Sequence, residues 1–263
     1  MTFTGTASLV RLRDKLVSDG HAVLDGPPTP LTYTSDVDAN SLVRDIIQFP
    51  HAFVIMCLME RGGNSNTAAL VPYRLMKALG TFAIEDLVQL TEAECADLFA
   101  GPPPLHRWHP KMARVFHLAV QRISSAYDGD ASQMWADQPS SARVVRRFLA
   151  FYGAGQKIAT MAANLLVRDF HVSLADYASI DVSADVHVVR VMQRLGFVKA
   201  KGADALLDTV YAAREMNPSF PGIFDLALWG LGRNICRPRS PRCGMCPLRD
   251  DCEYFALTQP TKA

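Results

Sequence analysis

Four cysteines lie within one short stretch near the end of the sequence, with gaps of six, two and five residues between them (Cys236, Cys243, Cys246 and Cys252). Thiolates bind soft metals, and four of them in one stretch form a complete ligand set without a distant partner. The proline and glycine residues between them favour a compact loop over a helix. The spacing therefore predicts a metal centre, and an iron–sulfur cluster fits it best.

Two other uses of these cysteines remain open. Zinc modules usually arrange their ligands as two close pairs, and here only Cys243 and Cys246 form one. Disulfides require an oxidising compartment, and the first residues lack the basic and apolar regions of a signal peptide. We therefore expect a cytoplasmic protein in which Cys57 and Cys95 are small core residues.

A second stretch suited to chemistry is Phe151-Tyr-Gly153-Ala-Gly155-Gln-Lys157, which connects two segments of helical pattern, 141–149 and 156–167. Glycines at this spacing allow a tight turn whose amide groups point outward, and such a turn before a helix favours a bound phosphate. Lys157 places an amine on the first turn of the second helix. Taken alone, the pattern also fits an ordinary helix–helix turn.

A carboxylate with neighbouring polar groups follows in Asp185-Val-His187-Val-Val-Arg190. Asp185 is a candidate catalytic group, and a helix cap is the alternative interpretation. Asp176 and Asp181 lie close enough in sequence to compete with it. We expect His187 and Arg190 to support the structure.

Charge is concentrated although the net charge is only +1. Arginines crowd the cysteine stretch (Arg233, Arg237, Arg239, Arg242 and Arg249) and precede the glycine turn (Arg143, Arg146 and Arg147). Concentrated arginines suit local contacts with phosphates, while a solvated charged face is the alternative. No apolar run approaches the roughly 20 residues of a membrane span, so we expect no membrane partner.

Helical periodicity runs through most of the chain, and no segment alternates like a strand. The expected helices include residues 6–19, 38–49, 51–60, 66–79, 83–89, 92–99 and 110–126. Residues 182–191 are the best strand candidate by β-branching, but their charges do not alternate. The fold class is therefore predicted to be all-α.

The ordered set of glycine turn, lysine, aspartate and four-cysteine loop resembles the endonuclease III family of helix-hairpin-helix DNA glycosylases. That resemblance implies a six-helix barrel domain with the hairpin (50–168) and an iron–sulfur cluster domain (1–49 and 169–263), flanking a DNA-binding cleft. The four cysteines would hold a [4Fe–4S] cluster. Lys157 matches the family's nucleophile and Asp185 its catalytic aspartate. Gly153, Ala154 and Gly155 match the hairpin that binds a DNA phosphate.

Two departures from the family pattern bear on specificity. Tyr152 replaces the proline that usually precedes the hairpin glycine. The loop Glu60-Arg61-Gly62-Gly63-Asn64 lacks the glutamine that, in pyrimidine-specific members, fills the gap left by a flipped base. Arg61 or Asn64 would have to act as a substitute wedge, which weakens the inference that the substrate is an oxidised pyrimidine.

These motifs together predict a bifunctional glycosylase and abasic-site lyase for base excision repair. It would bind duplex DNA with damaged bases or abasic sites as a monomer, with Arg239 and Arg242 also contacting DNA. Oxidised pyrimidines are the expected substrate. The alternatives are a monofunctional glycosylase for another damaged or mismatched base, like the adenine-excising relatives that lack the lysine, and a non-catalytic iron–sulfur DNA-binding module.

Overall fold

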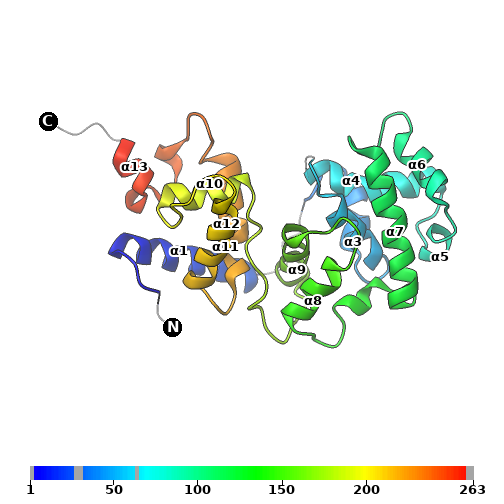
Figure 1. Cartoon of the computed structure of the whole chain (residues 1–263), viewed down its shortest axis with the longest axis horizontal. Coiled ribbons are helices and arrows are strands. Elements are labelled where there is room, and N and C mark those ends of the chain that lie inside the picture. The colour runs from blue at the N-terminus through cyan, green and yellow to red at the C-terminus, as the bar shows by residue number, and fades with distance from the viewer. Residues whose placement is uncertain (1–2, 27–31, 63–64, 259–263) are drawn as a thin grey trace. The chain divides into compact units, whose positions relative to one another are not determined.

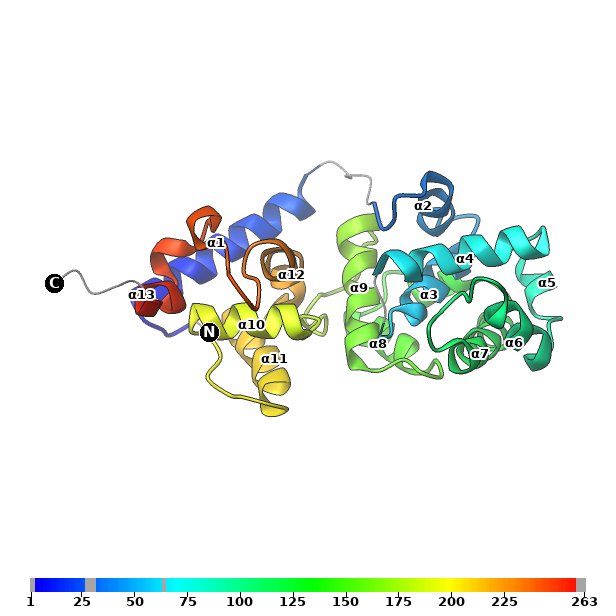
Figure 2. The ribbon, with the colours of Figure 1, turned by 90° about the horizontal axis from the view of Figure 1, so that it is seen from above.

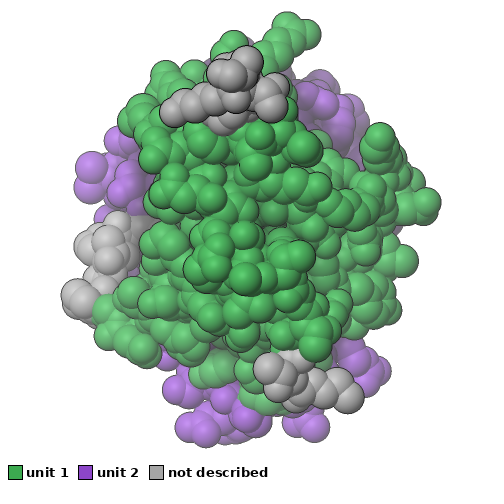
Figure 3. Space-filling view, turned by 90° about the vertical axis from the view of Figure 1, so that its left-hand side faces the viewer, with its two compact units in different colours: residues 1–27, 176–263 green, residues 28–175 purple. Residues whose placement is uncertain are grey.

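The computed structural model describes residues 3–26, 32–62 and 65–258, and it is helical throughout, with no strand among these residues. The chain divides into two compact units (Figures 1 and 3). Unit 1 comprises residues 1–27 and 176–263, and unit 2 comprises residues 28–175. The all-α prediction is confirmed.

Unit 2 is built around α3 (Pro50–Met59), all ten residues of which are buried. Pro50 occupies the first turn of this helix, where its missing N–H costs no hydrogen bond. Around α3 pack α2, α4, α7 and α9 (Figures 1 and 2). The helices of unit 2 besides α3 are α2 (Val37–Arg44), α4 (Ser65–Leu79), α5 (Ile84–Leu87), α6 (Glu92–Ala100), α7 (His109–Tyr127), α8 (Ser141–Leu149) and α9 (Gln156–Phe170).

Unit 1 joins the first helix of the chain to the last third. Its helices are α1 (Ala7–Leu24), α10 (Val186–Leu195), α11 (Asp204–Met216), α12 (Asp225–Asn234) and α13 (Glu253–Thr258). α10 and α12 pack closely because Gly232 faces α10: a Cβ there would lie 2.8 Å from the Cβ of His187. The cysteine loop follows α12 directly and contains two short 3₁₀ turns, Cys243–Met245 and Arg249–Asp251.

Some boundaries differ from those expected from the sequence. Residues 32–49 were expected with the cluster domain, but α2 packs on α3 and α4 and so lies in unit 2. The segment 182–191 is not a strand, because Asp185 caps α10, which begins at Val186. α11 was not anticipated. Within the described ranges, no helix is both long and apolar enough to cross a membrane.

Candidate functional site

The four cysteines of the predicted metal centre line one pocket in unit 1. The other walls are largely apolar and come from α10, α12, α13 and the loop itself (Val191, Leu195, Leu231, Ile235, Leu248 and Phe255). Burial raises the pKa of the Cys246 and Cys252 thiols, and the neighbouring cysteines raise it further. Four thiolates this close together therefore need a cationic group between them, which is what a bound metal centre supplies.

The donor set fits a cluster better than a single ion. Among residues 3–26, 32–62 and 65–258, no three His, Cys, Asp or Glu side chains are placed to hold one metal ion together. A [4Fe–4S] cluster takes four cysteine thiolates as its ligands, which is the donor set present in this loop. Cys236, Cys243, Cys246 and Cys252 would hold it, and the apolar walls would limit the access of water.

Arg194, near the end of α10, joins the two ends of the cysteine loop. Its Nη1 donates hydrogen bonds to Cys236 Sγ (3.3 Å) and to the Arg237 carbonyl (2.7 Å). Its own carbonyl accepts a hydrogen bond from the Cys252 thiol (3.3 Å). The guanidinium also lies 4.4 Å above the Tyr254 ring. Donation to a ligand sulfur stabilises the thiolate form, so Arg194 supports the site, although no sequence motif identified it.

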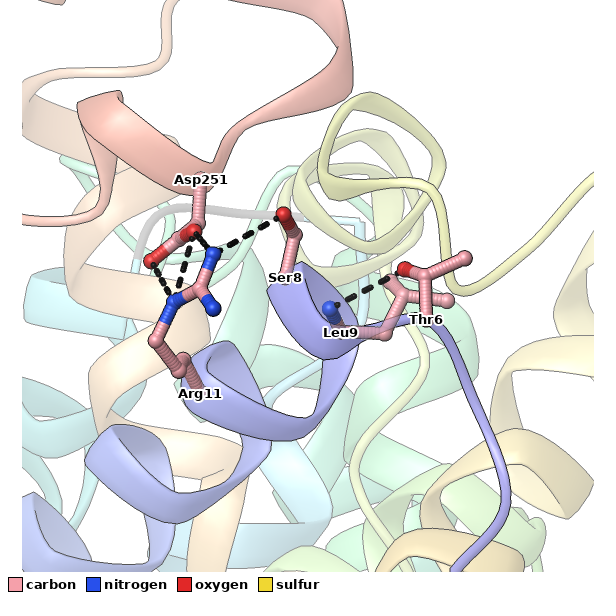
Figure 4. Close-up of polar contacts among 5 residues, drawn as sticks. All are labelled: Thr6, Ser8, Leu9, Arg11 and Asp251. Atoms are coloured by element: carbon pink, nitrogen blue, oxygen red, sulfur yellow. Dashed lines mark hydrogen bonds and ion pairs between the residues drawn. The ribbon is translucent and has the colours of Figure 1, made fainter.

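α1 contacts the C-terminal end of the cysteine loop through Arg11 and Asp251. Arg11 Nε donates to Asp251 Oδ1 at 3.0 Å, and Arg11 Nη2 donates to Ser8 Oγ at 3.2 Å (Figure 4). This pairing lowers the pKa of the Asp251 carboxyl, chiefly through the hydrogen bond from Arg11. The loop is thus anchored by α10 on one side and by α1 on the other.

Asp185, the predicted catalytic carboxylate, caps α10. Its Oδ1 accepts hydrogen bonds from the backbone N–H groups of His187 (2.8 Å) and Val188 (2.9 Å). Its Oδ2 makes no hydrogen bond within the described residues and is left for other contacts. The side chain is half-buried, so the cap fixes the position of this carboxylate without hiding it.

The two competing aspartates are engaged elsewhere. Asp181 is 3% exposed and accepts two hydrogen bonds from Arg214, at 2.6 and 2.8 Å. Asp176 Oδ1 accepts the Ala178 N–H in a local turn. Arg190 also has a structural position, because its Nε donates to the Cys236 carbonyl at 2.8 Å and its Nη2 to the Gly232 carbonyl at 2.7 Å.

In unit 2 the glycine turn joins α8 to α9, as predicted. Gly153 has φ +85°, in the left-handed region that favours glycine, and the Ala154 N–H closes the turn onto the Phe151 carbonyl (3.1 Å). Gly155 is the N-cap of α9, and a Cβ added there would meet nothing within 4 Å. Lys157 follows in the first turn of α9 and is exposed. The amine therefore stands beside an open helix N-terminus.

The loop preceding α4 contacts this turn. Arg61 Nη1 lies 3.2 Å from the position a Cβ on Gly153 would take. Gly62 has φ +59°, and a Cβ on it would lie 2.1 Å from Trp108 Cη2, so the indole occupies the space beside this glycine. Trp108 is nevertheless 41% exposed, and the Arg107 guanidinium lies 4.5 Å from its ring. Asn64 falls outside the described residues.

The remaining predicted DNA contacts lie on the surface. Arg239 and Arg242 are exposed in the cysteine loop, and Arg143 and Arg146 are exposed on α8. Arg147 differs, since its Nη1 donates to the carbonyls of Gln133 (3.1 Å) and Met134 (2.8 Å). The structure thus brings the four cysteines together, and it brings Arg61 to the glycine turn. Lys157 belongs to unit 2 and Asp185 to unit 1.

Sequence comparisons agree with this arrangement. Residues 236–252 match the model of the iron–sulfur binding domain of endonuclease III. Endonuclease III of Rickettsia prowazekii is 30% identical over 106 residues, which is 40% of this chain and 44% of the relative. An adenine DNA glycosylase of Mycolicibacterium smegmatis is 32% identical over 156 residues, 57% of this chain and 46% of the relative. The matches therefore span less than half the length of these relatives.

Structural comparisons extend the likeness to nearly the whole chain. A trapped endonuclease III–DNA covalent intermediate superposes with a TM-score of 0.60 at 16% identity, covering 94% of this chain and 97% of that one. A thermostable thymine-DNA glycosylase gives a TM-score of 0.60 over 94% and 98% of the two chains, also at 16% identity. At this identity the likeness shows the fold. The cluster loop and the fold together confirm that the chain resembles the endonuclease III family of iron–sulfur DNA glycosylases.

Proposed function

We propose that this protein is a base-excision DNA glycosylase with abasic-site lyase activity on duplex DNA. The observation that carries the proposal is the exposed Lys157 on the first turn of α9, directly after the phosphate-binding type of turn. Asp185 at the start of α10 supplies the second group that the chemistry needs. Oxidised pyrimidines are the first substrates to test.

Lys157 would act as the nucleophile. Its amine forms a bond to C1′ of the damaged nucleotide while the bond from C1′ to the base breaks and the base leaves with a proton. Opening of the sugar then gives a Schiff base between the lysine nitrogen and C1′. Loss of a proton from C2′ and departure of the 3′ phosphate cut the strand by β-elimination. An exposed amine directly after a turn of the phosphate-binding type supports this role for Lys157.

Asp185 would stabilise the positive charge that develops on the sugar as the base departs. Because its Oδ1 is held by two backbone N–H groups, the carboxylate does not need to reorganise during the reaction. The proton that the lysine loses on attack would pass to solvent.

Cleavage requires that the damaged nucleotide leaves the base stack, at a cost of a few kcal/mol. Gly62 has no side chain to fill the resulting gap. The indole of Trp108 lies against Gly62 and is partly exposed. We propose that Trp108 stacks in the gap, because base–aromatic stacking contributes roughly 1–3 kcal/mol per base. Trp108 would then have the wedge role for which the sequence suggests Arg61 or Asn64.

A monofunctional glycosylase is the second candidate, because adenine DNA glycosylases are among the relatives. A panel of duplexes separates the two candidates: oxidised pyrimidines, uracil, alkylated bases, 8-oxoguanine, adenine opposite 8-oxoguanine, and preformed abasic sites. We expect base release and strand cutting on at least one damaged pyrimidine without added alkali. Base release that yields strand breaks only after alkali would establish the monofunctional alternative. Binding without release from any duplex would indicate a non-catalytic module.

A further inference from the structure

Tyr152 is exposed at the glycine turn of unit 2, where the resembled family has proline. The side chain is 46% exposed. Its backbone N–H makes no hydrogen bond within the described residues, so a proline there would remove no backbone hydrogen bond. What tyrosine adds at this position is therefore a phenol on the surface beside the turn.

Arg114 of α7 lies over this phenol, with its guanidinium carbon 5.4 Å from the ring centroid. Its Nε forms an ion pair with Glu92 at 3.5 Å, and both side chains are more than half exposed. A guanidinium carries five N–H donors, so this single pairing leaves donors for a further ligand. The ring contact keeps the cation next to the phenolic hydroxyl.

Arg61 approaches the turn at the next residue. Its Nη1 lies 3.2 Å from the Cβ position of Gly153, where Val115, the residue after Arg114, also packs. The Arg61 guanidinium forms no ion pair with any other described residue. Two guanidinium groups and one phenol thus gather around two consecutive turn residues, all within unit 2.

We infer that Tyr152, Arg114 and Arg61 form a contact surface for the DNA backbone beside the glycine turn. Guanidinium groups bind phosphate through paired N–H donors, and tyrosine hydroxyls also donate to phosphate oxygens. The surface therefore adds phosphate contacts to the one expected at the turn itself. This inference rests on the proposed function, since it takes DNA as the ligand.

The test is DNA binding, measured by fluorescence anisotropy on an undamaged duplex and an abasic duplex across a salt series. Arg114→Gln and Arg61→Gln should each weaken binding roughly tenfold on both duplexes. Each should also reduce the slope of log affinity against log salt by about one. Tyr152→Pro should weaken binding several-fold with an unchanged melting temperature. Glu92→Gln is the matched opposite: it releases Arg114 from its ion pair and should strengthen binding.

The possible outcomes distinguish failure of this inference from failure of the proposed function. Wild-type protein that binds neither duplex would remove DNA as the ligand and with it the proposed function. Wild-type binding with unchanged affinities and salt slopes in the variants would overturn the contact surface alone. An Arg61→Gln variant that binds normally but excises bases poorly would show that Arg61 acts on the base. Melting curves confirm that each variant is folded.

Discussion

The glycine turn (residues 150–155), which Arg61 and Arg114 approach from other segments, and the cysteine loop (residues 236–252), which carries its own arginines, are held in different ways. In the turn, Phe151 is 2% exposed, and Gly153 packs against Val115. In the loop, Leu248 alone is buried, and the chain runs through short 3₁₀ turns. Packing therefore fixes the turn, whereas the loop depends on its cluster and on a few arginine contacts.

Among the changes considered, removing one thiolate should have the largest effect, because it disorders the cysteine loop and leaves the glycine turn intact. Cys243→Ser should lose iron, because one corner of the cluster is then without a ligand. We expect proteolytic cleavage within residues 236–252, no cleavage within unit 2, and DNA binding weakened roughly tenfold or more as Arg239 and Arg242 lose their positions. Iron content, limited proteolysis and anisotropy measure the three effects.

Cys95→Ala is the matched control, since Cys95 is fully buried in unit 2 and lies outside the loop. It should retain the iron and the visible absorbance of the wild-type protein. A Cys243→Ser protein whose loop resists proteolysis without iron would show that packing holds both regions alike.

Two glycines of the turn should respond differently to the same change. Gly153→Ala should cost about 1–2 kcal/mol, because φ is +85° and the new Cβ would lie 2.9 Å from Val115 Cγ2. Gly155→Ala meets nothing within 4 Å at φ −114° and should change stability by less than about 0.5 kcal/mol. Its methyl group would stand where a phosphate approaches, so DNA binding should still weaken. Denaturant unfolding and anisotropy test this pair, and equal stability costs would contradict the packing account.

Acid should destabilise unit 2. His51 is 4% exposed and stacks on Phe82, and burial lowers its pKa below the ordinary 6.5. Because the unfolded chain then takes up a proton more readily than the folded one, stability is full above about pH 6.5 and falls below it. The melting temperature should drop between pH 6.5 and 5, and less steeply in His51→Gln. His171→Asn, at an exposed histidine, should keep the wild-type profile. An unchanged slope in His51→Gln would exclude this histidine as a cause.

The smallest effect concerns the contact of α1 with the loop (Figure 4). The Arg11 side chain is 60% exposed and that of Asp251 25%, and ion pairs near the surface contribute little. Arg11→Ala should speed loss of the cluster to a chelator by less than about twofold. Lys15→Ala, which removes an exposed pair within α1 itself, should leave the rate unchanged. A much faster loss in Arg11→Ala would show that α1 is a principal support of the loop.

The sequence predicted the local positions of the candidate residues, which depend on helix starts and on short spacings. Lys157 stands on the first turn of α9 and Asp185 at the cap of α10, because glycine and aspartate have well-defined roles at helix starts. The four cysteines share a pocket because their spacing closes a loop.

The contacts that a single sequence could not reveal join distant segments. Three such contacts depend on how the helices pack: Trp108 with Gly62, Arg61 with Gly153, and Arg194 with Cys236. The same holds for α2, whose apolar positions fit either unit until its packing on α3 and α4 is seen. Periodicity identifies which face of a helix is buried, but it does not identify the neighbour.

The central claim is that Lys157 is the nucleophile, and borohydride trapping tests it most directly. Duplex DNA with an abasic site, incubated with wild-type protein and borohydride, should yield a covalent protein–DNA complex because the Schiff base is reduced in place. Lys157→Ala should abolish the complex, while Lys111→Ala, at an exposed lysine of α7, should form it normally. Undiminished trapping by Lys157→Ala would contradict the account.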